Sequence, residues 1–227
     1  MFAPVFLSQK MAYSQKLRIT EIFHSLQGES RTAGLPTVFI RLTGCPLRCQ
    51  YCDTAYAFRG GKLISITEII ESVKAYECLH VTVTGGEPLA QPLCIDLLKA
   101  LCDSNFIVSL ETSGAFMVDE VDKRVSVVLD LKTPGSSECA KNIYENLSHL
   151  NEKDQVKFVI CDRNDYEWSK AKIKQYDLGS KVGEVLFSPS YDQLKGAELA
   201  NWVLEDGLSV RVQLQLHKLL WGLEPGR

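Results

Sequence analysis

The chain carries three cysteines within eight residues, Cys45, Cys49 and Cys52, in the spacing C-x3-C-x2-C. Thiolates bind iron–sulfur clusters, and four of them usually saturate a [4Fe–4S] unit. Three thiolates leave one iron of such a cluster open to a ligand from outside the protein. An open iron is of no use for outer-sphere electron transfer, but it can bind and reduce a small molecule. The spacing therefore predicts a catalytic [4Fe–4S] cluster.

Zinc binding and simple burial are alternative roles for these cysteines. A structural zinc site takes four ligands, commonly two C-x2-C pairs or paired histidines. The remaining five cysteines are scattered, and the nearest histidine upstream is His24, so a second ligand pair is absent. Against simple burial, Arg48 and Gln50 between the thiols indicate a polar loop.

The composition indicates one soluble globular domain over residues 1–227, with 45% hydrophobic and 23% charged residues. A formal net charge of −3 gives no electrostatic reason to expect nucleic-acid binding. No apolar run approaches the roughly 18 residues that span a bilayer, so we expect no membrane partner. Because a disulfide framework suits short secreted chains, the eight cysteines favour the reducing cytoplasm.

The N-terminal segment carries no pattern that predicts structure. Residues 1–15 lack a basic stretch and have only a short apolar one, so we expect no signal peptide. Met11 is an alternative start. We therefore expect residues 1–16 to be an N-terminal extension that is disordered or results from a start codon assigned too far upstream.

Short β-branched runs alternate with helical-period segments, which predicts a mainly parallel α/β sheet. The expected strands are 37–42, 80–84, 107–111, 125–130, 155–160, 184–188 and 210–216, with an edge strand at 17–23. The expected helices are 67–76, capped by Thr67 or Ser65, and 94–102, 142–150, 164–175 and 192–204.

Four polar or glycine-rich motifs directly follow expected strands. They are 44–52, 85–88, 112–114 and 132–135. Sites in parallel α/β sheets form at the carboxyl ends of strands, so these motifs predict one shared active-site face. No G-x-G-x-x-G follows a strand, which favours a partial β/α barrel over a dinucleotide-binding sheet. After Ser65 the chain runs directly into a compact helix. We therefore expect a reduced set of helices and an abbreviated barrel.

With Tyr51 directly before its last cysteine, the loop resembles the radical S-adenosylmethionine (SAM) superfamily. Gly85-Gly86-Glu87-Pro88 is similar to the superfamily's Gly-Gly-Glu motif, although alone it would be an ordinary turn. The resemblance implies that SAM binds the open iron and that its reductive cleavage gives a 5′-deoxyadenosyl radical. It also implies that Glu87 receives the SAM amino group. Gly86 is expected to allow close approach of the ligand.

A narrower resemblance runs from about Glu21 to the C-terminus, to the 7-carboxy-7-deazaguanine synthase family. It is carried by the segments 26–29 (LQGE), 39–42 (FIRL), 52–54 (CDT), 111–114 (ETSG) and 215–218 (QLHK). The resemblance implies conversion of 6-carboxy-5,6,7,8-tetrahydropterin to 7-carboxy-7-deazaguanine with loss of ammonia, on the route to queuosine. It also implies Mg²⁺, a homodimer and an electron donor such as flavodoxin.

The same resemblance implies a set of site residues. The expected SAM contacts are Tyr51, Cys52, Asp53, Gly86, Glu87, Ser113 and Lys132. The expected substrate contacts are Leu26, Gln27, Gly28, Arg41, Thr84 and His217, and Thr54 is the expected Mg²⁺ ligand. The guanidinium of Arg41 is a planar fork that matches the substrate carboxylate. A hydroxyl such as that of Thr54 suits Mg²⁺, which prefers oxygen ligands.

Each of these assignments has an ordinary alternative. Arg41 could be a solvated strand residue, Thr54 a turn or cap, and His217 a satisfied core histidine. Two positions depart from the family pattern: Ser30 replaces a glycine, and Asp130-Leu131 precedes Lys132 where some members have Ser-Pro. Two alternative functions remain, namely a radical SAM activase that makes a glycyl radical on a protein, and a non-catalytic iron–sulfur or zinc module.

Overall fold

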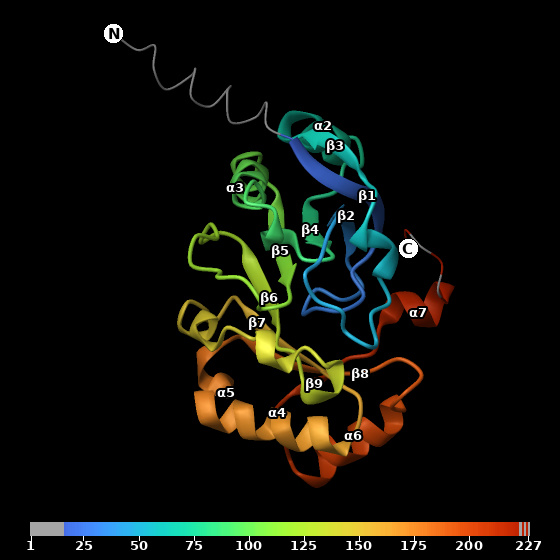
Figure 1. Ribbon diagram of the computed structural model, residues 1–227, viewed down its shortest axis with the longest axis vertical. Helices are drawn as coiled ribbons and strands as arrows, with labels where there is room; N and C mark the ends of the chain where they lie inside the picture. Colours follow the sequence, from blue (N-terminus) through green and yellow to red (C-terminus); the bar gives the residue numbers. More distant parts are fainter. Residues whose placement is uncertain (1–15, 223, 225, 227) are drawn as a thin grey trace.

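The structure, a computed structural model, describes residues 16–222, 224 and 226; the expectations for residues 1–15 lie outside this range. Within it, nine strands form one open sheet in the order β3-β1-β2-β4-β5-β6-β7-β8-β9 (Figure 1). The strands are β1 (Lys16–Leu26), β2 (Pro36–Leu42), β3 (Lys62–Ser65), β4 (His80–Gly85), β5 (Ile107–Thr112), β6 (Ser126–Asp130), β7 (Gln155–Ile160), β8 (Glu184–Pro189) and β9 (Arg211–Val212).

All neighbouring pairs from β2 to β9 are parallel, while β1 pairs antiparallel with both β2 and β3. The sheet is not closed, because β3 and β9 are its two ends. This is the expected partial barrel with a mainly parallel sheet. The expected strand at 17–23 is present, but the short strand β3, which the sequence pattern does not predict, forms the edge instead.

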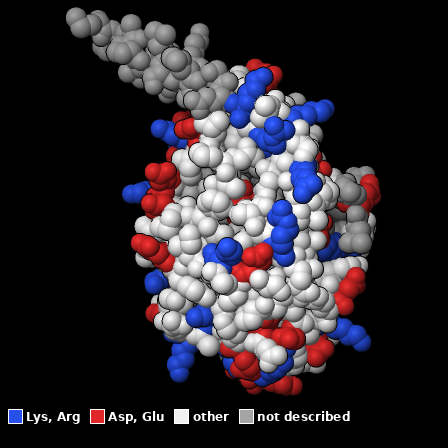
Figure 2. Space-filling view, in the orientation of Figure 1, with Lys and Arg blue, Asp and Glu red and all other residues white. Residues whose placement is uncertain are grey.

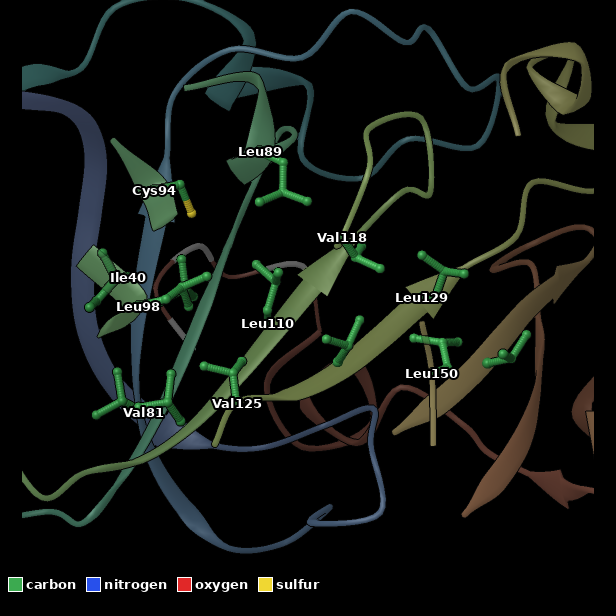
Figure 3. Close-up of a cluster of buried hydrophobic side chains, with 14 of the residues drawn as sticks. Ile40, Val81, Leu89, Cys94, Leu98, Leu110, Val118, Val125, Leu129 and Leu150 are labelled. Carbon is green, nitrogen blue, oxygen red and sulfur yellow. The ribbon is translucent and has the colours of Figure 1, made fainter. Parts of the chain in front are cut away.

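The helices that end by residue 205 pack on one face of the sheet, while the last helix follows β9 and contributes His217 and Lys218 to a cavity on the other side. The helices are α2 (Ile66–Lys74), α3 (Cys94–Asp103), α4 (Arg163–Tyr176), α5 (Leu178–Lys181), α6 (Gly196–Glu205) and α7 (Leu216–Trp221). The buried core lies between these helices and the sheet; Figure 3 shows part of it, including Cys94 and Leu98 of α3 with Ile40 of β2 and Val81 of β4.

The strands alternate between this core and the opposite face. In β4, Val81 and Val83 belong to the core, whereas Thr84 faces a cavity. In β7, Phe158 belongs to the core and Lys157 faces the same cavity. Successive strand residues point to opposite faces, so the concave face of the sheet is polar and is available for a site.

Strand β1 contains a β-bulge that changes which residues face the cavity. Ile19 is opposite Leu42, but Glu21 is opposite the very next residue, Arg41, so Thr20 is an extra residue in β1. Ile19 belongs to the core, and without the extra residue Glu21 would point to the same face as Ile19. The bulge instead turns Glu21 toward the cavity side, together with Arg41.

Three expected helices differ in the structure, one of which, expected at 192–204, begins only at Gly196 as α6. Helix α2 begins with a capping box in which Ser65 and Glu68 bond each other's backbone, so Ser65 is the cap and not Thr67. The expected helix at 142–150 is wrong: the segment holds only a 3₁₀ helix, Tyr144–Ser148. The buried amide of Asn146 bonds the backbone of Val118 and Phe116 instead, which fixes the segment without a regular helix.

The expected strand at 210–216 is also largely wrong. Strand β9 covers only Arg211 and Val212, and α7 begins at Leu216. His217 therefore lies in the first turn of a helix and not at the end of a strand.

None of the helices within the described residues is long and apolar enough to cross a membrane. Basic and acidic side chains both occur on the face shown in Figure 2.

Candidate active site

A cavity of about 560 Å³ opens on the concave face of the sheet. It is lined by residues that follow β2, β4, β5, β6 and β8, and by the loop between β1 and β2. The four motifs expected to share one face contribute to it: Cys45, Gly86, Ser113 and Lys132 are all lining residues. The prediction that these motifs share one face at the carboxyl ends of the strands is confirmed.

All three cysteines of the C-x3-C-x2-C loop line this cavity. The loop is folded locally, with the Cys52 amide bonded to the Cys49 carbonyl at 3.1 Å. Arg48 fixes it further, since its guanidinium donates to the Cys45 carbonyl at 2.7 Å. Burial raises the pKa of each thiol, that of Cys49 to about 11. Binding of iron would therefore release protons.

The three thiols line one cavity, as three cysteines that hold one cluster must. Among the described residues, no group of three or more His, Cys, Asp or Glu side chains surrounds one ion position. A cubane takes its three cysteines at three separate corners, so the thiols need not converge on one point. A zinc site would require four ligands to converge.

Gly86 packs directly against the cysteine loop. A Cβ at Gly86 would lie 2.3 Å from the Gly44 carbonyl oxygen and 2.8 Å from Cys45 Cβ. The Glu87 amide also donates to the Gly44 carbonyl at 2.8 Å. The glycine thus allows the end of β4 to approach the cysteine loop, a constraint that is additional to the expected approach of a ligand.

The carboxylate of Glu87 is fully buried and bonds its own protein. It accepts from the Ser113 hydroxyl at 2.5 Å and amide at 2.7 Å, and from the Thr112 hydroxyl at 2.8 Å. Among the described residues that line the cavity, Ser113 is present and Glu87 is not. In this structure Glu87 therefore positions Ser113, and the predicted contact of Glu87 with SAM stays a prediction.

Lys132 and Tyr51 form a buried pair beside the cysteines. The Lys132 ammonium lies 2.9 Å from an Asp130 oxygen and 5.9 Å from the centroid of the Tyr51 ring. Burial opposes the charge, but Asp130 holds the pKa of Lys132 well above its usual range. The second Asp130 oxygen and the Tyr51 hydroxyl are buried without a partner among the described residues, so both are free to bond a ligand.

On the strand side of the cavity, Gln27 and Thr84 both bond Glu111. The Gln27 amide donates to one oxygen at 3.2 Å, and the Thr84 hydroxyl donates to the other at 2.9 Å. Burial and the nearby Glu29 carboxylate raise the pKa of Glu111, although Lys157 opposes this. The expected substrate residues Gln27 and Thr84 are thus brought together on a half-buried carboxyl.

Glu29 connects the β1–β2 loop to two distant elements. It forms an ion pair with Lys157 of β7, and the Gln215 amide donates to it at 2.7 Å. Burial alone would raise the pKa of Glu29, but the Lys157 ammonium lowers it overall, so the carboxylate stays charged. A Cβ on the adjacent Gly28 would lie 2.6 Å from His217 Nδ1, which places these two expected substrate residues in contact.

The expected Mg²⁺ ligand, Thr54, lines the cavity next to Asp53. Its hydroxyl donates to one Asp53 oxygen at 2.8 Å, while Lys218 of α7 lies 2.7 Å from the other. An oxygen pair of this kind suits a hard cation. The role of Thr54 as a Mg²⁺ ligand stays a prediction.

Arg41 lines the cavity near the end of β2, and its Nε donates to Glu21 Oε1 at 2.7 Å. Its side chain is 16% exposed, so Arg41 is not a solvated strand residue. Leu26 also lines the cavity.

Several residues of the site were not assigned from the sequence. They are Glu21, Glu29, Tyr56, Glu111, Asp130, Lys157, Gln215 and Lys218. Two signals were available for some of them. A lysine in the otherwise apolar strand 155–160 indicates a polar face, and Glu29, Gln215 and Lys218 lie within motifs that carried the resemblance. Nothing in the sequence indicated the bulge that orients Glu21.

Comparisons with known proteins identify the family of the chain. The family model of the radical SAM superfamily matches residues 39–176. The chain is 44% identical over 214 residues to the 7-carboxy-7-deazaguanine synthase of Chlorobaculum tepidum, covering 93% of this chain and 97% of that one. It is 42% identical to the enzyme of that name from Koribacter versatilis, covering 90% and 97% of the two chains.

Among solved structures, the fold is similar to that of QueE from Escherichia coli. The TM-score is 0.71 at 23% identity, over 88% of this chain and 94% of that chain. The fold of Streptococcus suis SuiB bound to precursor peptide SuiA also matches, with a TM-score of 0.56 at 14% identity over 76% and 46% of the chains. Both likenesses show the partial barrel fold.

Proposed function

The chain belongs to the 7-carboxy-7-deazaguanine synthase family of the radical SAM superfamily, and we propose that the cavity described above carries out that family's reaction. The substrate is 6-carboxy-5,6,7,8-tetrahydropterin and the product 7-carboxy-7-deazaguanine, with loss of ammonia. The observation that carries the proposal is that the three thiols and the expected pterin residues line one cavity.

Cys45, Cys49 and Cys52 are the residues that would hold the cluster. A [4Fe–4S] cluster with SAM supplies a reductive cleavage that generates the hydrogen-abstracting radical. Ser113 and Lys132 lie in the same cavity, where a hydroxyl and an ammonium suit the polar groups of SAM. The Tyr51 hydroxyl and the Asp130 oxygen that lack a partner among the described residues lie beside them and offer further hydrogen bonds.

The polar wall around Gln27, Thr84 and Glu111 suits a pterin, whose ring carries alternating donors and acceptors. The pKa of Glu111 is raised, so this carboxyl takes up a proton more readily than an ordinary glutamate. In its protonated form it donates a hydrogen bond, and in its ionised form it only accepts. Arg41, at the end of β2, binds the substrate carboxylate, and Thr54 binds Mg²⁺ in the cavity.

The test is turnover under anaerobic conditions. The protein is reconstituted with iron and sulfide and incubated with SAM, a reductant, Mg²⁺ and the carboxylated pterin, and the product is identified by mass. We expect the carboxylated deazaguanine and ammonia. SAM cleavage without pterin turnover would contradict the substrate, and failure to cleave SAM would contradict the reaction class.

We further propose a homodimer, an external electron donor such as flavodoxin, and action in the cytoplasm. Support for the dimer comes from Leu219 and Leu220 of α7, which are 66% and 51% exposed. Support for a reducing compartment comes from the eight cysteines, each of which is a free thiol. Light scattering on the reconstituted protein tests the dimer, and reduction by flavodoxin tests the donor.

A further inference from the structure

We propose that Glu21 and Tyr56 are positioning residues that hold the Arg41 guanidinium with one edge bonded to protein and its other edge free for a carboxylate. The inference rests on the proposed function, because it takes Arg41 as the contact for the substrate carboxylate. It goes beyond that function by explaining why the cavity binds a carboxylated ring in one orientation. Neither Glu21 nor Tyr56 belongs to the site expected from the sequence.

The first observation is the pairing of Glu21 with Arg41. The two residues are directly opposite each other on β1 and β2, and Arg41 Nε lies 2.7 Å from Glu21 Oε1. The side chains are 23% and 16% exposed, so solvent screens this pair only partly. A guanidinium has five N–H donors in a fixed plane, and Glu21 engages Nε. The two terminal nitrogens on the other edge are not used in this pair.

The second observation is that Tyr56 fixes Glu21 in turn. The Tyr56 hydroxyl lies 2.8 Å from the same oxygen, Glu21 Oε1. Burial, with a further contribution from the hydrogen bond to Glu21, raises the pKa of Tyr56 to about 12. The hydroxyl therefore stays protonated at neutral pH and donates to the carboxylate. Glu21 cannot turn away from Arg41 without losing this bond.

The third observation concerns the faces of the guanidinium. Its central carbon lies 5.6 Å from the centroid of the Phe23 ring and 5.9 Å from that of Tyr56. Phe23 is itself stacked on Phe39, with ring centroids 5.0 Å apart. Cation–π contacts and this stacking restrict rotation of the guanidinium. Because Nε bonds Glu21 and two rings lie beside the guanidinium, the terminal N–H groups are the part of Arg41 that an incoming ligand can bond.

The β-bulge at Thr20 makes the arrangement possible. It places Glu21 and Phe23 opposite Arg41 and Phe39 on the cavity side of the sheet. A carboxylate bound to two parallel N–H donors of a fixed guanidinium is held in a defined plane. The ring attached to that carboxylate then enters the cavity in one orientation. This explains how a single arginine provides both affinity and orientation.

The role assigned to Glu21 is that of a hydrogen-bond acceptor, and its negative charge is not required. The side-chain amide oxygen of a glutamine at position 21 can accept the hydrogen bond from Arg41 Nε with the same geometry. Glu21→Gln should therefore keep Arg41 in place, whereas Glu21→Ala should release it. Tyr56→Phe keeps the ring beside the guanidinium but removes the hydroxyl that orients Glu21, so it should have a smaller effect than Glu21→Ala.

The experiment measures binding to the protein reconstituted with its cluster and SAM. Two probes are titrated, pterin-6-carboxylate and unsubstituted pterin, and the ratio of their dissociation constants reports the carboxylate contact alone. The ratio is measured for the wild type, Glu21→Ala, Glu21→Gln, Tyr56→Phe, Arg41→Ala and the double variant Glu21→Ala/Arg41→Ala. Glu71→Gln, on the exposed side of α2, is the matched control.

We expect the wild type to prefer the carboxylated probe by roughly 30-fold or more, and Arg41→Ala to lose the preference. Glu21→Ala should reduce the preference about tenfold, and Tyr56→Phe about threefold. Glu21→Gln should stay within about threefold of the wild type, and Glu71→Gln should equal it. In the Arg41→Ala background, Glu21→Ala should have no further effect, because it acts through Arg41.

Three results would overturn the inference. The first is an unchanged preference in Glu21→Ala. The second is an equal loss of affinity for both probes, which would show a merely structural role for Glu21. The third is a wild type with no preference for the carboxylated probe. Only that third result also contradicts the proposed substrate, so failure of this inference and failure of the proposed function are distinguishable.

Discussion

The ammonium nitrogen of Lys218 lies 2.7 Å from a carboxylate oxygen of Asp53, the residue that follows the third cysteine of the cluster loop. Burial alone would raise the pKa of the Asp53 carboxyl, but Lys218 holds that pKa well below its usual range. The Gln215 amide bonds the same oxygen at 3.2 Å. The pair therefore attaches α7, the last helix of the structure, to the loop that carries the thiols.

Lys218→Met should loosen the attachment of α7 without preventing cluster assembly. Asp53 is 38% exposed, so solvent screening limits the loss to about 1 kcal/mol, or about fivefold in the opening equilibrium. The rate of limited proteolysis within 213–222 measures this opening. Lys195→Met, at the N-cap position of α6 with an exposed side chain that makes no capping hydrogen bond, should show the wild-type rate. If Lys218→Met is cleaved at the same rate as the wild type, the ion pair between Lys218 and Asp53 does not hold α7 in place.

The cysteine assignment predicts a sharp division among the eight thiols. Cys45→Ala, Cys49→Ala and Cys52→Ala should each abolish cluster assembly and reductive SAM cleavage, because three thiolates are needed to hold a cluster with one open iron. Cys78→Ala, which removes a half-buried thiol bonded to the Pro36 carbonyl, should keep full iron and sulfide content. Iron and sulfide retained at the wild-type level in Cys49→Ala would refute the assignment.

Gly86→Ala should lower cluster content as well as SAM affinity. The added Cβ would lie 2.3 Å from the Gly44 carbonyl oxygen, so the cysteine loop must move. Gly179→Ala in α5 is a matched control, since a Cβ there meets nothing within 4 Å. Iron content and SAM binding are measured on both proteins. Loss of SAM binding with full cluster content would restore the simpler view that Gly86 only makes room for the ligand.

Thr54→Ala should weaken the dependence of turnover on Mg²⁺. Loss of a hydroxyl ligand should raise the Mg²⁺ concentration for half-maximal activity about tenfold or more, with SAM binding unchanged. Thr67→Ala, on the exposed first turn of α2, serves as the control. The same half-maximal Mg²⁺ concentration in Thr54→Ala and in the wild type would remove Thr54 from the metal site.

Glu111→Gln should be more thermally stable than the wild type, by a margin that grows with pH. Burial in the folded protein raises the pKa of Glu111, so the folded state binds more protons than the unfolded state while this carboxyl titrates. Wild-type stability therefore falls as pH rises from the ordinary pKa of 4.5 in the unfolded chain through the raised pKa of the folded one. Melting temperatures of both proteins at about pH 5 and about pH 8 test this. If the difference in melting temperature between the variant and the wild type shrinks as pH rises, the pKa of Glu111 is lowered and not raised on folding.

Most of the parallel sheet was predictable because its strands are apolar runs flanked by turn residues. The expected strand 155–160 has the observed bounds of β7, and 80–84 and 107–111 differ from β4 and β5 by one residue. The order of motifs along these strands was enough to predict one site at their carboxyl ends. This part of the fold depends on local patterns, which a single sequence carries.

The remainder depends on contacts between distant residues. The amide of Asn146 holds residues 144–148 through distant backbone groups, which helical periodicity does not indicate. Similarly, Gln215 bonds Glu29 and Asp53 instead of extending β9. In the site, the family motifs identified Arg41, but its partner Glu21 depends on the register of β1 against β2. Register is set by pairing and not by composition.

The bulge at Thr20 also limits which insertions and deletions β1 can tolerate. Ile19, just before the bulge, belongs to the core, whereas Glu21, two residues later, lies beside Arg41 on the cavity side. Removing one residue there would move every later side chain of the strand to the opposite face. The number of residues between Ile19 and Glu21 therefore matters more to the site than the identity of Thr20, whose hydroxyl contacts that of Thr43 at 2.7 Å. Aligned relatives that bind the same substrate should vary at this position without a gap.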